Sequence, residues 1–213
     1  MHIKKLASLL LLLALQGYIP FAIAAEEPVS FVEKPATRVL IDKLRSGGYV
    51  LYMRHANTDK SRLDRVPQVD LNDCNTQRPL SVEGRKLAAQ VGEYIREAKI
   101  PVGEVLSSPL CRAKETAEAA FGHFDVEINL MYSGNMTDAE KIPVNKKTRE
   151  LLSKPVQAKT NRLIVAHAPG LMDVMGYFPK PEGTVVVFRP DPKKGFEYLG
   201  SIAPGLWHEL LLK

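Results

Sequence analysis

The sequence lacks the features that define several common classes of protein. Only 2 of its 213 residues are cysteine, so a small cystine-rich scaffold is excluded. No internal repeat is present, and this excludes a long solenoid. Lys and Arg residues are scattered rather than gathered in one block, so no nucleic-acid partner is expected. With 45% hydrophobic and 25% charged residues, the composition is that of an ordinary folded domain.

Long apolar runs are absent after the first residues of the chain. Two lysines at positions 4–5 precede an apolar run at 9–15, and the small-residue triplet at 22–24 has the A-x-A form of a cleavage site. This order predicts a secretory signal peptide over 1–24. A glycine and a proline end the apolar run short of the roughly 20 residues that a spanning helix needs. We therefore expect no stable membrane insertion after cleavage, and one folded domain over 25–213.

The leader places that domain in the periplasm or outside the cell, where cysteines meet oxidising conditions. Both cysteines, Cys74 and Cys111, lie in the expected domain. A single disulfide between them and a pair of free, partly buried thiols are both compatible with the spacing.

Buried strand patterns alternate with amphipathic helical patterns along the domain. The predicted strands cover 49–53, 105–106, 126–130, 163–166, 183–188 and 196–202. The predicted helices cover 37–45, 81–98, 112–120 and 138–152. This alternation favours an α/β fold, a three-layer sandwich with a largely parallel central sheet and helices on both faces.

Polar side chains follow three of the predicted strands at their carboxyl ends. Arg54 and His55 follow the first strand, Ser107-Ser108 with Arg112 follow the second, and His167 follows the fourth. Each group alone is compatible with a structural role. In open α/β sheets, however, ligands bind at the carboxyl ends of the strands. We therefore expect the three groups to converge on one site.

Four sequence motifs strengthen this expectation when they are taken together. They are YMRHANTD, RPLSVEGR, LSSPLCRAKET and IVAHAPG. Their order and spacing resemble the phosphoglycerate-mutase-like branch of the histidine phosphatase superfamily, with a further likeness to its small secreted members. The other branch, which contains phytases and acid phosphatases, carries Asp directly after the second histidine, where this chain has Ala168.

The resemblance implies a role for each of the converging side chains. His55 is the expected nucleophile, because a neutral imidazole can accept a phosphoryl group. Arg54 and Arg112 are the expected clamps, since a guanidinium matches the geometry of phosphate oxygens. His167 is expected to donate a hydrogen bond beside them.

Two residues just after the nucleophile, Asn57 and Thr58, are expected to add phosphate contacts. Simple capping of the loop explains them equally well. The helix that follows Pro109 could add backbone donors for an anion.

The leaving-group acid is the point at which the sequence departs from the family. Many relatives carry Glu shortly after the third strand, but residues 130–135 contain no carboxylate. Asp138 is the leading candidate for the acid, because it follows the expected position, with Asp59 and Glu140 as alternatives. The missing Glu also argues against a mutase.

These observations predict an exported phosphomonoesterase that acts through a phosphohistidine on His55. Its expected partner is a phosphorylated small molecule or glycan, and no cofactor is expected. The alternative is a protein that binds or senses a phosphate ester but turns it over poorly. No metal is expected, since the histidines show no ligand spacing and Arg54 would repel a cation.

Overall fold

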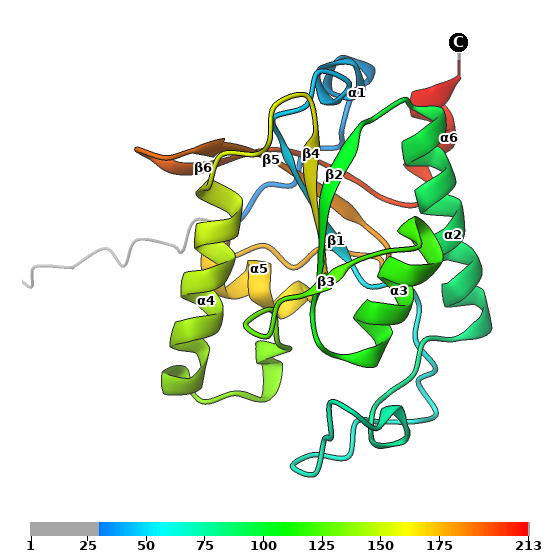
Figure 1. Ribbon diagram of the computed structural model, residues 1–213, viewed down its shortest axis with the longest axis vertical. Coiled ribbons are helices and arrows are strands. Elements are labelled where there is room, and N and C mark those ends of the chain that lie inside the picture. The colour runs from blue at the N-terminus through cyan, green and yellow to red at the C-terminus, as the bar shows by residue number, and fades with distance from the viewer. Residues whose placement is uncertain (1–29, 213) are drawn as a thin grey trace, which may run out of the picture.

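The computed structural model describes residues 30–212, and a six-stranded sheet lies at the centre of this part (Figure 1). The predicted leader, 1–24, lies outside the described residues. The strands are β1 (Val50–Arg54), β2 (Val102–Ser107), β3 (Asp125–Val126), β4 (Asn161–Ala166), β5 (Val185–Asp191) and β6 (Gly195–Ile202). Their order is β3-β2-β4-β1-β5-β6. The first four of these are parallel and the last two pair antiparallel, so the largely parallel sheet is confirmed.

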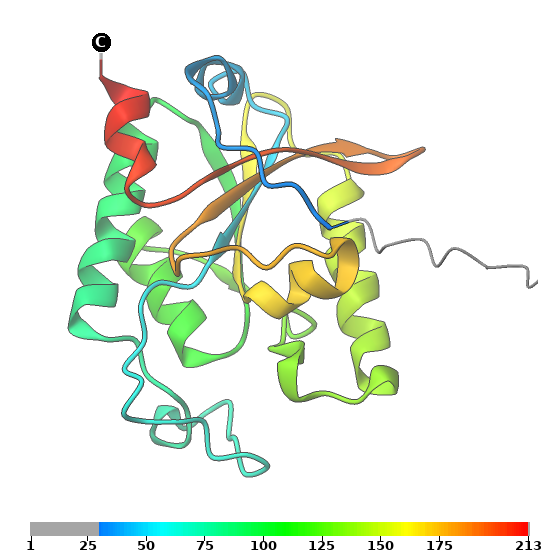
Figure 2. The ribbon, with the colours of Figure 1, turned by 180° about the vertical axis from the view of Figure 1, so that it is seen from behind.

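Helices cover both faces of this sheet, which confirms the three-layer sandwich. They are α1 (Arg38–Leu44), α2 (Val82–Glu97), α3 (Cys111–Phe121), α4 (Asp138–Ser153), α5 (Ala168–Met175) and α6 (Leu206–Leu211), with short 3-10 turns η1 (Cys74–Thr76) and η2 (Ser133–Asn135). Figures 1 and 2 show α2, α3 and α6 on one side of the sheet and α4 and α5 on the other. Within 30–212, no helix is long and apolar enough to cross a bilayer.

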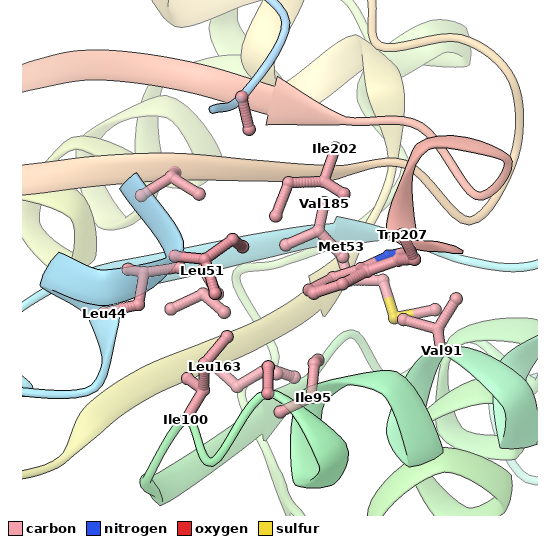
Figure 3. Packing of buried hydrophobic residues seen from close by; sticks show 14 of the residues in the cluster. Leu44, Leu51, Met53, Val91, Ile95, Ile100, Leu163, Val185, Ile202 and Trp207 are labelled. Carbon is pink, nitrogen blue, oxygen red and sulfur yellow. The ribbon is translucent and has the colours of Figure 1, made fainter. Parts of the chain in front are cut away.

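Strand β1 has a continuous apolar sequence because both of its faces are buried. Leu51 and Met53 point into the core beneath α1, α2 and α6, where Trp207 also packs (Figure 3). Val50 and Tyr52 point into the opposite core beneath α4 and α5. A strand with two buried faces must be central, so the residues that follow β1 emerge in the middle of the sheet edge.

The chain differs from the predicted pattern in three short elements. Strand β3 has two residues instead of the expected 126–130, because the Glu127 side chain accepts hydrogen bonds from the backbone and side chain of Asn129 at 3.0 and 3.1 Å. These local bonds turn the chain away from the sheet. Helices α5 and α6 were not predicted. Two residues in the sequence are typical of the ends of a helix such as α5: a proline in its first turn and Gly176 just after its end. In the structure Gly176 has φ of 74°.

A disulfide joins Cys74 to Cys111, which resolves the two alternatives left open by the spacing. Cys74 lies in the long loop 56–80, and Cys111 is the first residue of α3. The bridge therefore fixes this loop against the helix that carries Arg112.

We expect loss of this disulfide to lower the stability of the protein. Closing a loop of 37 residues should contribute about 2–4 kcal/mol by restricting the unfolded chain. Denaturant unfolding with and without a reductant measures the effect. A Cys74→Ser/Cys111→Ser variant serves as the control, because its stability should not respond to reductant. An equal response of both proteins would mean that the reductant acts elsewhere.

Candidate active site

The carboxyl ends of β1, β2 and β4 meet at one edge of the sheet, as the sequence predicts. The backbone N–H of His55 donates to the carbonyl of Ala166 at 2.9 Å, and that of Ser108 donates to the carbonyl of Val165 at 2.9 Å. The rings of His55 and His167 consequently lie with their centroids 5.2 Å apart. Hydrogen bonds of the sheet edge thus position both histidines.

His55 has the protonation state and tautomer that a nucleophile needs. Its Nδ1 lies 2.9 Å from the carbonyl oxygen of Ala56, which can only accept a hydrogen bond, so Nδ1 carries the proton and Nε2 keeps its lone pair. Burial lowers the pKa of His55 well below its usual value, and the charges of Arg112 and Arg54 lower it further. The imidazole is therefore neutral at physiological pH.

His167 is held on both its backbone and its ring. The hydroxyl of Tyr52 accepts from its N–H at 3.2 Å and donates to its carbonyl at 2.8 Å. On the ring, Nε2 lies 2.8 Å from Ser108 Oγ. When Ser108 donates to Nε2, Nδ1 carries the proton and can donate to a phosphate oxygen. Burial, followed by the charge of Arg112, lowers the pKa of His167 well below its usual value.

Arg112, the second residue of α3, is fully buried and has only part of its guanidinium occupied. Nη1 donates to both carboxylate oxygens of Asp64 at 3.0 and 3.3 Å. The guanidinium also lies 5.3 Å from the centre of the Tyr132 ring. Its Nε and Nη2 are buried without a partner among residues 30–212. These two donors form a planar fork that suits phosphate oxygens.

Arg54 is arranged in a similar way on the other side of His55. Its Nη1 donates to the carbonyl of Pro179 at 2.9 Å, and Nη2 donates to Glu182 at 3.3 Å. Phe178 packs against the guanidinium at 5.3 Å from its ring centre. Its Nε is buried and has no partner in the described part of the chain.

The loop after the nucleophile is held by the segment that carries the RPLSVEGR motif. The carbonyl of Asn57 accepts from Ser81 N–H at 2.9 Å. A Cβ at Gly84 would lie 1.9 Å from that carbonyl oxygen, so only glycine lets α2 approach the loop this closely. Thr58 donates from both its backbone and its hydroxyl to Glu182, at 3.3 and 3.4 Å. The structure thus places Asn57 and Thr58 beside Arg54.

Three further charged residues at the site were not predicted from the sequence. Arg78 lies close enough to lower the pKa of His55 and His167. Arg78 is the first residue of the RPLSVEGR motif, but the motif by itself does not indicate this role. Asp64 and Glu182 each bind one of the arginine clamps, and they lie in loops without a pattern that could have signalled them.

The structure does not bring the leading candidate for the acid, Asp138, to these residues. Asp138 is the exposed first residue of α4 and lines none of the cavities around the site. Glu140 is engaged in the capping box of the same helix with Thr137. Asp59 lines the cleft next to Arg54, and its carboxylate accepts hydrogen bonds from Ser61. A proton-donating role of Asp138 therefore stays a prediction.

The assembled side chains suit an oxyanion. Arg54, Arg78, Arg112 and His167 contribute five buried nitrogen atoms without a hydrogen-bond partner in the described part. Within residues 30–212, no group of three or more His, Cys, Asp and Glu side chains is placed to hold a metal ion. A neutral imidazole with a free Nε2 lone pair, placed beside fixed cationic donors, is an arrangement that suits phosphoryl transfer.

Comparison with known families agrees with this class. The sequence model of the histidine phosphatase superfamily (branch 1) matches residues 50–133, a range that includes both arginine clamps and His55. The resemblance predicted from the motifs is therefore confirmed. A search of curated proteins finds no match.

Solved structures show the same fold at low sequence identity. The protein histidine phosphatase SixA complexed with tungstate is 17% identical, with a TM-score of 0.52 over 74% of this chain and 97% of that one. A protein assigned as the phosphohistidine phosphatase SixA of Nakamurella multipartitia is 19% identical, with a TM-score of 0.50 over 75% and 98%. One assigned as an alpha-ribazole-5'-P phosphatase of Escherichia coli is 14% identical, with a TM-score of 0.50 over 73% and 97%.

Proposed function

We propose that the protein hydrolyses phosphate monoesters through a phosphohistidine at His55. The observation that carries this proposal is the set of unpartnered buried donors on Arg54, Arg112 and His167 around a neutral imidazole. Donors fixed at the transferring oxygens stabilise the charge that develops in the transition state. The phosphatase names of the structural relatives support the same class of reaction.

The proposed reaction consists of two successive displacements at phosphorus. In the first, Nε2 of His55 forms a bond to phosphorus while the ester P–O bond breaks, and the leaving oxygen takes a proton. In the second, water attacks phosphorus and gives a proton to the group that protonated the leaving oxygen, the N–P bond breaks, and inorganic phosphate leaves. Arg54 and Arg112 hold the same three oxygens in both steps, so one set of donors serves both transition states.

Glu182 is the carboxylate that we propose as the leaving-group acid, in place of the more distant Asp138. It lines the cleft beside Arg54 and is bound there by Arg54 and Thr58. A bound phosphate would compete for Arg54 and place a second negative charge beside Glu182. Such repulsion favours the protonated carboxyl group, which can then donate to the leaving oxygen.

A panel of phosphomonoesters tests the proposed function. Phenyl phosphate, glycerol phosphate and a sugar phosphate are incubated with the purified protein, with and without a chelator, and a phosphohistidine peptide serves as a phosphoramidate for comparison. We expect phosphate release that is insensitive to the chelator, because the arginines supply the cationic charge. Covalent label that survives alkali and is lost in acid identifies a phosphohistidine. Binding without any turnover or covalent labelling would favour the alternative, a phosphate-ester sensor.

We expect Arg112→Ala to weaken both phosphate binding and turnover, since the clamp acts in the ground and transition states. Loss of one fixed donor at a developing oxyanion lowers kcat by about 100-fold to 1,000-fold. Steady-state kinetics and vanadate affinity measure the two effects. Thermal unfolding of the same samples checks that the variant is folded, since Asp64 then loses its partner. An unchanged vanadate affinity in the folded variant would remove Arg112 from the site.

We also propose that the protein acts in the periplasm or outside the cell on a phosphorylated small molecule or glycan. The sequence pattern of the leader and the Cys74–Cys111 disulfide support this location, because disulfides persist in oxidising compartments. Cell fractionation and mass measurement of the N-terminus test it. A protein that retains its first residues in the cytoplasm would contradict export.

A further inference from the structure

A cleft of about 1320 Å³ opens beside the phosphate site. Arg54 lines it and also belongs to the proposed phosphate site, and Asn57 and Thr58 line it just after His55 in the chain, so the cleft adjoins that site. The part of a substrate that is joined to the transferred phosphoryl group can therefore extend into this space.

The cleft has a strong excess of positive charge. Its cationic lining residues are Arg54, Lys60, Arg62, Arg78, Arg85 and Lys180. Its acidic lining residues are Asp59, Glu83 and Glu182. This local excess of three charges lies in one concave region of a chain whose total formal charge is only +5.

Ion pairs with neighbouring carboxylates cancel only part of this positive charge. Two of the cations are paired inside the described residues, Arg54 with Glu182 and Arg85 with Glu115. Lys60, Arg62 and Lys180 form no ion pair within residues 30–212. These three lysine and arginine side chains are exposed and free to contact a ligand.

One aromatic ring contacts two of the cations. The Lys180 ammonium lies 5.5 Å and the Arg54 guanidinium 5.3 Å from the centre of the Phe178 ring. Arg54 is also paired with Glu182, whereas the Lys180 ammonium has only this ring contact among the described residues. Lys180 therefore attracts an anionic group in this part of the cleft more strongly than a neutral sugar or acyl group.

We propose that this cleft binds a second phosphate group of the substrate, so that the preferred substrate is a bisphosphorylated molecule. This inference rests on the proposed function, and it adds the class of leaving group. The first phosphate lies on His55, Arg54 and Arg112, and the second contacts Lys60, Arg62 and Lys180. Focusing of charge in a cleft of this kind raises the affinity for polyanionic ligands.

The test compares two sugars that differ by one phosphate. Values of kcat/KM are measured for fructose 1,6-bisphosphate, fructose 6-phosphate and phenyl phosphate. We expect the bisphosphate to be preferred over the monophosphate by about tenfold or more. A Lys60→Gln/Arg62→Gln/Lys180→Gln variant should lose this preference but keep its activity on phenyl phosphate, because none of its substituted side chains touches the transferred phosphate.

A matched control separates a local site from general attraction to a basic protein. Lys146→Gln/Lys193→Gln/Lys194→Gln removes the same number of charges from exposed positions on α4 and the β5–β6 turn. We expect it to keep the preference of the unmodified protein. An equal loss in both triple variants, or equal kcat/KM for the two fructose phosphates, would overturn the proposal.

Titration calorimetry measures the binding of fructose 1,6-bisphosphate directly. It therefore tests the second phosphate site independently of whether the protein hydrolyses phosphomonoesters. If no phosphomonoester is hydrolysed and His55 is never phosphorylated, the proposed function fails. Binding that is weakened by the cleft substitutions and not by the control substitutions would still support the second phosphate site. Binding that is absent, or unaffected by the cleft substitutions, would reject it.

Discussion

Replacing His55 by Ala should lower phosphate release by about 10,000-fold or more, since no other side chain at the site can carry the phosphoryl group. The Nδ1–H bond to Ala56 and the lowered pKa leave a neutral Nε2 as the attacking atom. Alanine removes that atom and leaves the arginine donors in place. We therefore expect vanadate or phosphate to bind to the variant, although turnover is lost.

Three measurements distinguish loss of the nucleophile in His55→Ala from loss of folding. Turnover is followed with phenyl phosphate, covalent labelling is followed after rapid quenching, and folding is followed by thermal unfolding. His208→Ala is the matched control, because His208 is exposed on α6 and belongs to no contact of the site. Labelling that persists in His55→Ala, or turnover within tenfold of the unmodified protein, would assign the nucleophile to another group.

The sheet and its functional edge were predictable because they depend on local burial and on short motifs. Strands β1 and β4 are buried on both faces and stand out as apolar runs, and each is followed directly by a site histidine. Parallel pairing of neighbouring strands then places His55 and His167 at the same edge. Arg112 follows from the third motif, since α3 begins directly after β2.

The carboxylates of the site could not be predicted in this way. Asp64 lies in the long loop that the Cys74–Cys111 disulfide ties to α3, and the sequence alone does not determine whether these cysteines pair. Glu182 precedes β5 and reaches Arg54 across 128 residues of sequence. Neither position follows from periodicity, because loop residues are placed by tertiary contacts. Asp138 was likewise chosen from its position in the chain alone, and its role as the acid stays a prediction.

The lowered pKa of His55 also determines how activity should change on the acidic side of the pH profile. The nucleophile is active when neutral, so its activity is lost only as pH falls through the lowered pKa. The loss of activity at low pH is therefore expected below pH 6.5, the ordinary pKa of histidine. Burial and the charge of Arg112 shift His167 in the same direction. Any loss of kcat at higher pH must consequently come from another group, and a proton-donating carboxyl group is the natural candidate.

Glu182→Gln should lower kcat for an alkyl phosphate by about 100-fold to 10,000-fold, because an alkoxide leaves slowly without a proton. With glycerol phosphate, kcat of the unmodified protein should fall at high pH as the acid ionises, and Glu182→Gln should lack this falling limb. Phenyl phosphate, whose leaving group hardly needs a proton, should show only a small change. Asp138→Asn is the matched comparison and should behave like the unmodified protein. If Asp138→Asn loses the falling limb and Glu182→Gln keeps it, the proton comes from Asp138.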